Sequence, residues 1–119
     1  MSDAANRFRE LVVDRAINGP GMAGSASRRA AFENHGVDEG ARPLIDKVAR
    51  HAWKVTDDDV AAAKAAGVRE DEIFELTVCA ALGQATRQLD AALAVLDTVT
   101  NPGAAHGETR DLANDGGRR

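Results

Sequence analysis

The sequence predicts an all-α fold, an Ala-rich helical domain of about five helices with one long central helix. Three observations support this. Apolar residues recur at helical spacing in successive segments, and Gly and Pro residues separate those segments. A third is the stretch 69–99, which has the pattern of a single long helix of roughly 45 Å, at about 1.5 Å per residue. No segment shows the strict alternation of a strand.

The composition predicts one domain with a thin core. The chain has 119 residues, only 3% of them aromatic, and Ala is its commonest residue. Small side chains bury little apolar area each, so contacts with other copies would help to stabilise the fold. We therefore expect a homo-oligomer. We expect residues 1–99 to form the domain, and the Gly-rich polar tail 100–119 to be disordered.

The charge and hydropathy patterns argue against two classes of partner. A net charge of −4 without a basic run does not fit a nucleic-acid binder. The longest near-apolar run, 76–85, is about half of what a membrane span needs. The N-terminus lacks the apolar region of a signal peptide, and the single Cys fits a reducing compartment. We expect a cytoplasmic protein.

Two helices are expected before residue 40. The first runs from about Asp3 to Asn18, and its predicted apolar face is formed by Phe8, Leu11, Val12 and Ala16. The run 18–21, Asn-Gly-Pro-Gly, ends it. A short helix over 25–34 follows, with a weakly defined register and apolar positions at Ala26, Ala30 and Phe32.

The third helix is expected over 43–55, with Pro43 in its first turn. Its apolar face comprises Leu44, Ile45, Val48, Ala52 and Val55. Trp53 points away from that face. It indicates either a second buried surface, against a helix, a subunit or a ligand, or a partly exposed ring that packs on its own chain.

Thr56 is expected to cap the fourth helix in a capping box with Asp59, and Gly67 to end it. Acidic residues then open the long helix, where they suit the positive end of its dipole. We expect its first part, 73–82, to be buried on all sides, with Ala80, Ala81 and Gly83 allowing close helix approach. Its second part should bury one stripe, formed by Leu82, Ala85, Leu89, Ala92, Leu93 and Leu96.

Three residues are candidates for chemistry. Cys79, the single thiol, lies in the most apolar stretch, where a small buried hydrophobic residue is the simpler interpretation. Glu75 lies among apolar residues, and a buried carboxylate needs a partner. Lys47, Arg50, His51 or Lys54 could supply it. Beside His51 it would form an acid–base couple, and otherwise a structural ion pair or an exposed carboxylate.

His51 is a candidate general base or, more simply, a packed and hydrogen-bonded residue at the rim of an apolar face. The three His residues are scattered, so no metal site is expected. Asp57, Asp58 and Asp59 are interpreted as a solvated helix start rather than a cation site. No nucleotide or cofactor motif is found, and we expect no cofactor.

The stretch DVAAAKAAGVREDEIFELTVCAALGQATRQLDAAL resembles the alkylhydroperoxidase D-like, or carboxymuconolactone decarboxylase-like, family. The likeness covers about 44–96, and RPLIDKVARHAWKVTDDDVAAAKAAG is similar to an uncharacterised bacterial subgroup. The resemblance implies an all-helical fold that assembles through its helices, often as trimers or hexamers.

The family's redox pair is missing from this chain. Counted back from Gly67, the family's Cys-x-x-Cys and following His fall on Ala52, Val55 and Asp59. The resemblance thus implies peroxide or thiol-linked antioxidant activity on a small-molecule substrate, but this chain lacks the family's two thiols. The site residues expected from the chain's own chemistry remain His51, Glu75 and Cys79, in a small pocket between helices or subunits. The alternative is a non-catalytic helical oligomer that acts as a structural or interaction module.

Overall fold

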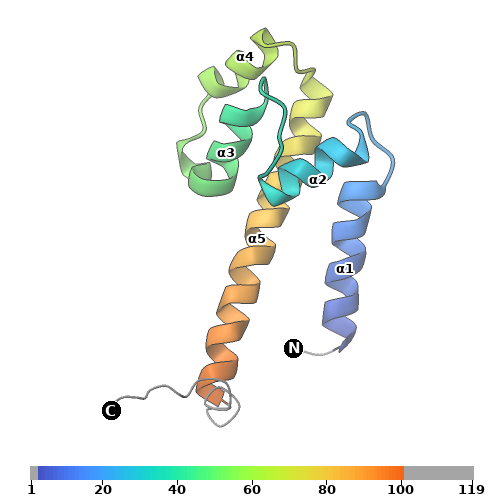
Figure 1. The fold of residues 1–119 in the computed structure, drawn as a ribbon, viewed down its shortest axis with the longest axis vertical. Helices are drawn as coiled ribbons and strands as arrows, with labels where there is room; N and C mark the ends of the chain where they lie inside the picture. The colour runs from blue at the N-terminus through green and yellow to red at the C-terminus, as the bar shows by residue number, and fades with distance from the viewer. Residues whose placement is uncertain (1–2, 101–119) are drawn as a thin grey trace. The chain divides into compact units, whose positions relative to one another are not determined.

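The structure, a computed structural model, describes residues 3–100, and within that range every regular element is helical (Figure 1). The elements are α1 (Asp3–Asn18), α2 (Ser25–Glu33), α3 (Arg42–His51), the 3₁₀ turn η1 (Ala52–Lys54), α4 (Asp57–Ala65) and α5 (Glu70–Thr100). The predicted all-α class with one long helix is confirmed. No described helix has both the length and the apolar character needed to cross a membrane.

The chain separates into two compact units, residues 1–86 and 87–119. The first holds α1 to α4 and the beginning of α5. The described part of the second is the remainder of α5, residues 87–100. The tail 100–119, which we expect to be disordered, lies outside the described residues from 101 onward. The single domain over 1–99 therefore stays a prediction.

Local signals set the helix ends. The Thr56 side chain accepts the N–H of Asp59, and the Asp59 carboxylate accepts the N–H of Thr56, which completes the predicted capping box. Gly67 has φ +98°, a value that favours Gly, and it separates α4 from α5. Asn34, also left-handed, ends α2.

The third helix is shorter than predicted. It ends at His51, where φ is −145° and ψ is 57°, and η1 follows in place of further α-helix to Val55. Val55 and Thr56 are extended because an N-cap residue has β-like dihedrals. The backbone must therefore leave the helix before Thr56 in order to start α4.

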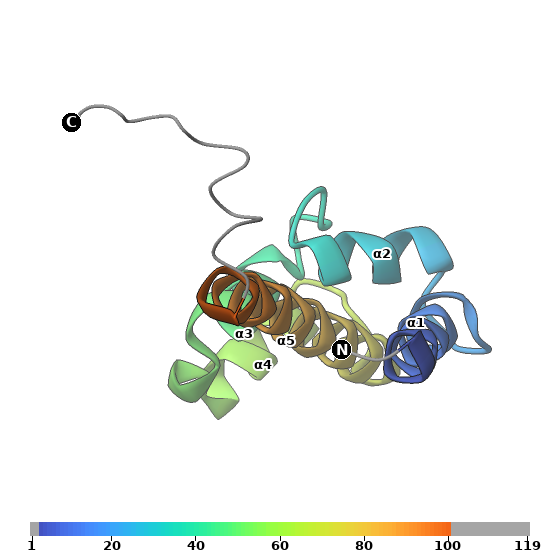
Figure 2. The same ribbon diagram turned by 90° about the horizontal axis from the view of Figure 1, so that it is seen from below.

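The core of the first unit lies around the beginning of α5. There α1 lies on one side of α5, and α3 and α4 lie on the other (Figures 1 and 2). The buried apolar residues of this core include Ala31, Leu44, Ile45, Val48, Ala63, Ile73, Leu76, Cys79 and Ala80. Gly83 is also buried, and a Cβ there would collide with the Phe32 carbonyl. The predicted close helix approach at Gly83 is therefore confirmed.

The expectation that 73–82 is buried on all sides is wrong. Phe74 is 69% exposed and Val78 43%, and Ala81 is exposed as well. The buried positions, which include Leu76, Cys79 and Ala80, recur at helical spacing and occupy one side of α5. The other helices of the unit cover that side alone.

The predicted inner face of α1 is wrong for Phe8 and Leu11, although Ala16 is half-buried and packs against the core. Phe8 is 70% exposed and Leu11 67%, whereas Ile17 is 2% exposed. At about 100° per residue, Ile17 lies opposite the side that carries Phe8 and Leu11. The more apolar side of α1 therefore faces away from the core of the first unit.

Candidate functional site

Glu75 binds backbone rather than a charged side chain. Its Oε2 accepts the N–H of Met22 at 2.8 Å, and its Oε1 accepts the N–H of Ala23 at 2.7 Å. Both donors lie in the α1–α2 loop, more than fifty positions away in the sequence. These N–H groups, with a smaller contribution from the charge of Arg28, lower the pKa of the Glu75 carboxyl. The expected partner among Lys47, Arg50, His51 and Lys54 is not the one found.

Gly21 allows this close approach of carboxylate and loop. A Cβ at this position would lie 2.9 Å from Oε1 of Glu75. The Gly-Pro-Gly run, predicted to be a helix-ending turn, thus also leaves room for the carboxylate over the loop backbone.

Arg28 is a buried cation in the same region. It is 6% exposed, and its Nη1 donates to the carbonyl of Ala16 at 3.2 Å. Its Nε has no hydrogen-bond partner among the described residues. Ala16 lies in the last turn of α1, where carbonyls lack helical partners and a nearby cation is favourable. Arg28 therefore stabilises the end of α1.

Cys79 donates to that same Ala16 carbonyl from 3.4 Å, and its side chain is 1% exposed. Burial raises the pKa of the thiol, although the charge of Arg28 opposes the change and that of Glu75 adds to it. A buried thiol with a raised pKa is a poor nucleophile, because the thiolate is the reactive form.

His51 lies elsewhere. It is exposed at the end of α3, and its ring meets that of Trp53 edge to face, with centroids 5.2 Å apart. Figures 1 and 2 place α3 and the α1–α2 loop on opposite sides of α5. The structure therefore does not bring His51 beside Glu75. Trp53 is 76% exposed, so in this chain its ring packs on its own neighbour rather than in a second core.

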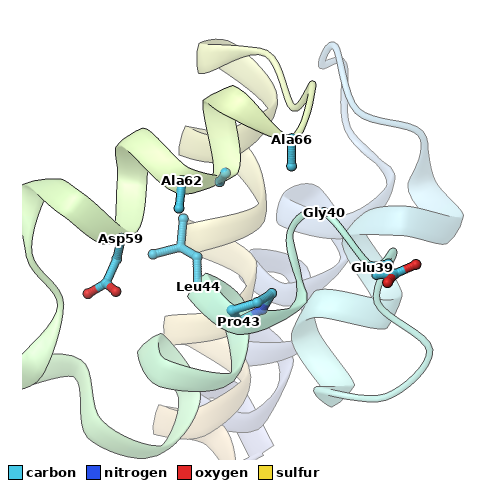
Figure 3. Close-up of a pocket in the computed structure, with 8 residues that line it drawn as sticks. Glu39, Gly40, Pro43, Leu44, Asp59, Ala62 and Ala66 are labelled. Carbon is cyan, nitrogen blue, oxygen red and sulfur yellow. The ribbon is translucent and has the colours of Figure 1, made fainter.

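A hollow of about 410 Å³ lies between the start of α3 and α4 (Figure 3). Its wall is mostly small and apolar, with Leu44, Ala62 and Ala66, and its two carboxylates, Glu39 and Asp59, lie at opposite ends. Asp59 is held by Lys47, with both oxygens 3.0 Å from Nζ, and by the capping box. The hollow contains none of the three candidate residues.

Arg28, Glu75 and Cys79 form what we call the loop cluster. Each of its members contacts backbone of the segment from the last turn of α1 to the α1–α2 loop. Glu75 is an ionised acceptor, Arg28 is a cation at a helix end, and Cys79 is closed off from solvent. This arrangement holds the α1–α2 segment against α5. Glu75 also lines an open surface hollow of about 530 Å³ together with Arg69, Glu70, Asp71 and Phe74, whereas the Cys79 side chain is sealed from solvent.

One member of this cluster, and the backbone partners of another member, were missed in the sequence. Arg28 was not predicted to be buried, because the register of α2 was defined only by Ala26, Ala30 and Phe32, whereas Arg28 and Ala31 are the buried positions. The amides of Met22 and Ala23 have no sequence signal, since every residue other than Pro carries an N–H.

Comparisons with protein-family models, with curated proteins and with solved structures found no match to this chain. The resemblance to the alkylhydroperoxidase D-like family therefore stays a prediction.

Proposed function

We propose that this protein is a non-catalytic helical module that acts by self-association, with its helices as the contact surface. The observation that carries the proposal is the outward apolar side of α1, where Phe8 and Leu11 are each about two-thirds exposed. Val12, beside them, is 39% exposed. Contiguous apolar side chains in contact with water are typical of protein interaction surfaces.

A second copy of the chain is the proposed partner because the core is thin. The largest fully buried side chains are Ile17, Ile45 and Cys79, and many other core positions are Ala. The apolar area buried within one chain is small, and its burial stabilises the fold by about 25 cal/mol per Å². Burial of further apolar surface between copies would add to this stabilisation. Trimers or hexamers, which the family resemblance implies, fall within this proposal.

The thiol-linked peroxide chemistry that the resemblance also implies has less support. It would need access to Cys79 and a lowered thiol pKa, whereas the thiol is sealed and its pKa is raised. An acid–base reaction would need His51 within reach of Glu75. His51 ends α3, whereas Glu75 binds the α1–α2 loop, and these two segments lie on opposite sides of α5 (Figures 1 and 2). These contacts favour the module over the enzyme.

Light scattering after size-exclusion chromatography tests the proposal. The wild-type chain should have a mass above that of one chain, and the double variant Phe8→Ser/Leu11→Ser should form a smaller assembly or a monomer. Met22→Ser, which removes another exposed apolar side chain from the same unit, is the matched control and should keep the wild-type mass. A wild type that stays monomeric at every concentration would refute self-association.

A further inference from the structure

Another hollow lies in the first unit, where α1 and α2 pack together beside α5. Its volume is about 300 Å³, and all of its lining residues fall within residues 1–86. This volume is at the lower end of the range of about 300–1,000 Å³ that is usual for ligand pockets. The hollow therefore suits a molecule of the size of an amino acid rather than one of the size of a nucleotide.

The most buried part of the wall is apolar. Ile17 is 2% exposed, and Val13 and Phe32 are half-buried. Thr86 of α5 adds a hydroxyl, which donates to the Leu82 carbonyl at 2.8 Å and whose oxygen is still able to accept. An apolar wall with a small number of polar groups is typical of small-molecule sites, in which the polar groups fix the orientation of the ligand.

The rest of the wall carries charges of both signs. Arg9 and Arg29 supply two guanidinium groups, and Glu10 and Asp14 supply two carboxylates, so the lining has no net charge. Asp14 accepts from the amide of Asn18 at 2.8 Å. Among the described residues, neither Glu10 nor Arg29 forms an ion pair or a side-chain hydrogen bond. A ligand with a single charge would be attracted by one pair of groups and repelled by the other, whereas a zwitterion is attracted by both.

We propose that this hollow binds an α-amino acid with an apolar side chain. The carboxylate of the ligand accepts from the guanidinium of Arg29, and its ammonium donates to the carboxylate of Glu10. Both are charge-assisted hydrogen bonds, which are stronger than those between neutral groups. The apolar side chain of the ligand lies against Val13, Ile17 and Phe32, where it is removed from water.

This site goes beyond the proposed self-association and is independent of it. Ile17, in the wall of the hollow, lies on the side of α1 opposite Phe8 and Leu11. An amino acid in the hollow and a second copy on the outward side of α1 would therefore contact different sides of the helix.

Calorimetric titration of the full-length chain at neutral pH tests the class of ligand. Three probes share one aromatic ring: phenylalanine has both charged groups, hydrocinnamate lacks the ammonium and phenethylamine lacks the carboxylate. We expect phenylalanine to bind most tightly, and the loss of either charged group to raise Kd by about tenfold.

Two substitutions assign the charged groups of the ligand to residues. Arg29→Gln should weaken phenylalanine by about tenfold without weakening phenethylamine, because that probe has no carboxylate. Glu10→Gln should weaken phenylalanine without weakening hydrocinnamate, which has no ammonium. Arg7→Gln on α1 and Glu33→Gln on α2 are the matched controls, since both residues are exposed and neither lines the hollow. Each control should bind phenylalanine as the wild type does.

Three results would overturn the proposal. They are no binding of phenylalanine at millimolar concentration, equal affinity for phenylalanine and hydrocinnamate, and an affinity for phenylalanine that neither Arg29→Gln nor Glu10→Gln changes. Circular dichroism checks the fold of each variant, and the titrations of the wild type do not depend on any variant. Light scattering remains a separate measurement. A monomeric chain that binds phenylalanine would support this site and refute the proposed function.

Discussion

The carboxylate of Glu75 holds the α1–α2 loop, whose Ala23 side chain also packs in the core. It accepts both N–H groups of Met22 and Ala23, and a hydrogen bond to a charged group contributes about 1.5–3 kcal/mol. Glu75→Gln keeps the shape of the side chain, but its amide can accept from only one of the two donors. We expect it to lower the free energy of unfolding by about 1–2 kcal/mol, since the site is half-buried. Urea denaturation at neutral pH measures this, with the exposed Glu39→Gln as control.

The same residue predicts a pH dependence. The folded-state pKa of Glu75 is lowered, so its contribution is complete above the unfolded pKa of about 4.3 and is lost as the pH falls through the folded value. The difference in unfolding free energy between wild type and Glu75→Gln should therefore be constant near neutrality and shrink in acid. A difference that grows on acidification would contradict this assignment of the carboxylate.

Cys79 should behave as a core residue. Because its thiol is buried and its pKa is raised, modification by a thiol reagent should be slower in the native protein than in denaturant, by more than roughly tenfold. Peroxide consumption with a thiol donor should be at background for both wild type and Cys79→Ser. Faster consumption by the wild type would restore the thiol-linked reading of the sequence.

At the scale of elements, the crossing of α2 and α5 depends on Gly83. A Cβ there would lie 2.8 Å from the carbonyl carbon of Phe32 and closer still to its oxygen. Overpacking of this kind costs about 1–3 kcal/mol, whereas Ala gains about 1 kcal/mol over Gly in helix propensity. Because the clash involves backbone, we expect Gly83→Ala to destabilise the fold in urea denaturation. Gly24→Ala, where a Cβ meets open space, should change stability by less than about 1 kcal/mol.

Helix positions were more predictable from the sequence than the sides that the helices bury. The start of α4 at Thr56 and its end near Gly67 depend on neighbouring residues, so local signals located them. The inner side of α1 depends on what packs against it. Phe8 and Leu11 made the more apolar side, yet Ile17 occupies the core. If copies of the chain associate, some apolar residues of α1 pack in the core and others pack between copies. The sequence pattern alone does not tell these two sets apart.

The candidate site shows the same limit. Glu75 was recognised because a carboxylate among apolar residues needs a partner. Its actual partners are backbone amides brought near by the path of the α1–α2 loop, which no side-chain pattern encodes. Arg28 was missed because one shift of register in a short Ala-rich helix changes which residue is buried. Residue chemistry thus located the cluster, whereas its role depends on the tertiary contacts.

At the scale of the whole molecule, stability should depend on concentration. The core holds few large side chains, and association contributes stability by mass action when the assembled state is folded. We therefore expect the thermal midpoint of the wild type to fall by a few degrees for each tenfold dilution. Differential scanning calorimetry at several concentrations measures it. Phe8→Ser/Leu11→Ser should flatten the dependence, while Met22→Ser should keep it, because only the former removes the outward apolar side of α1. A midpoint independent of concentration would mean that each chain folds alone, with its apolar helix sides left in water.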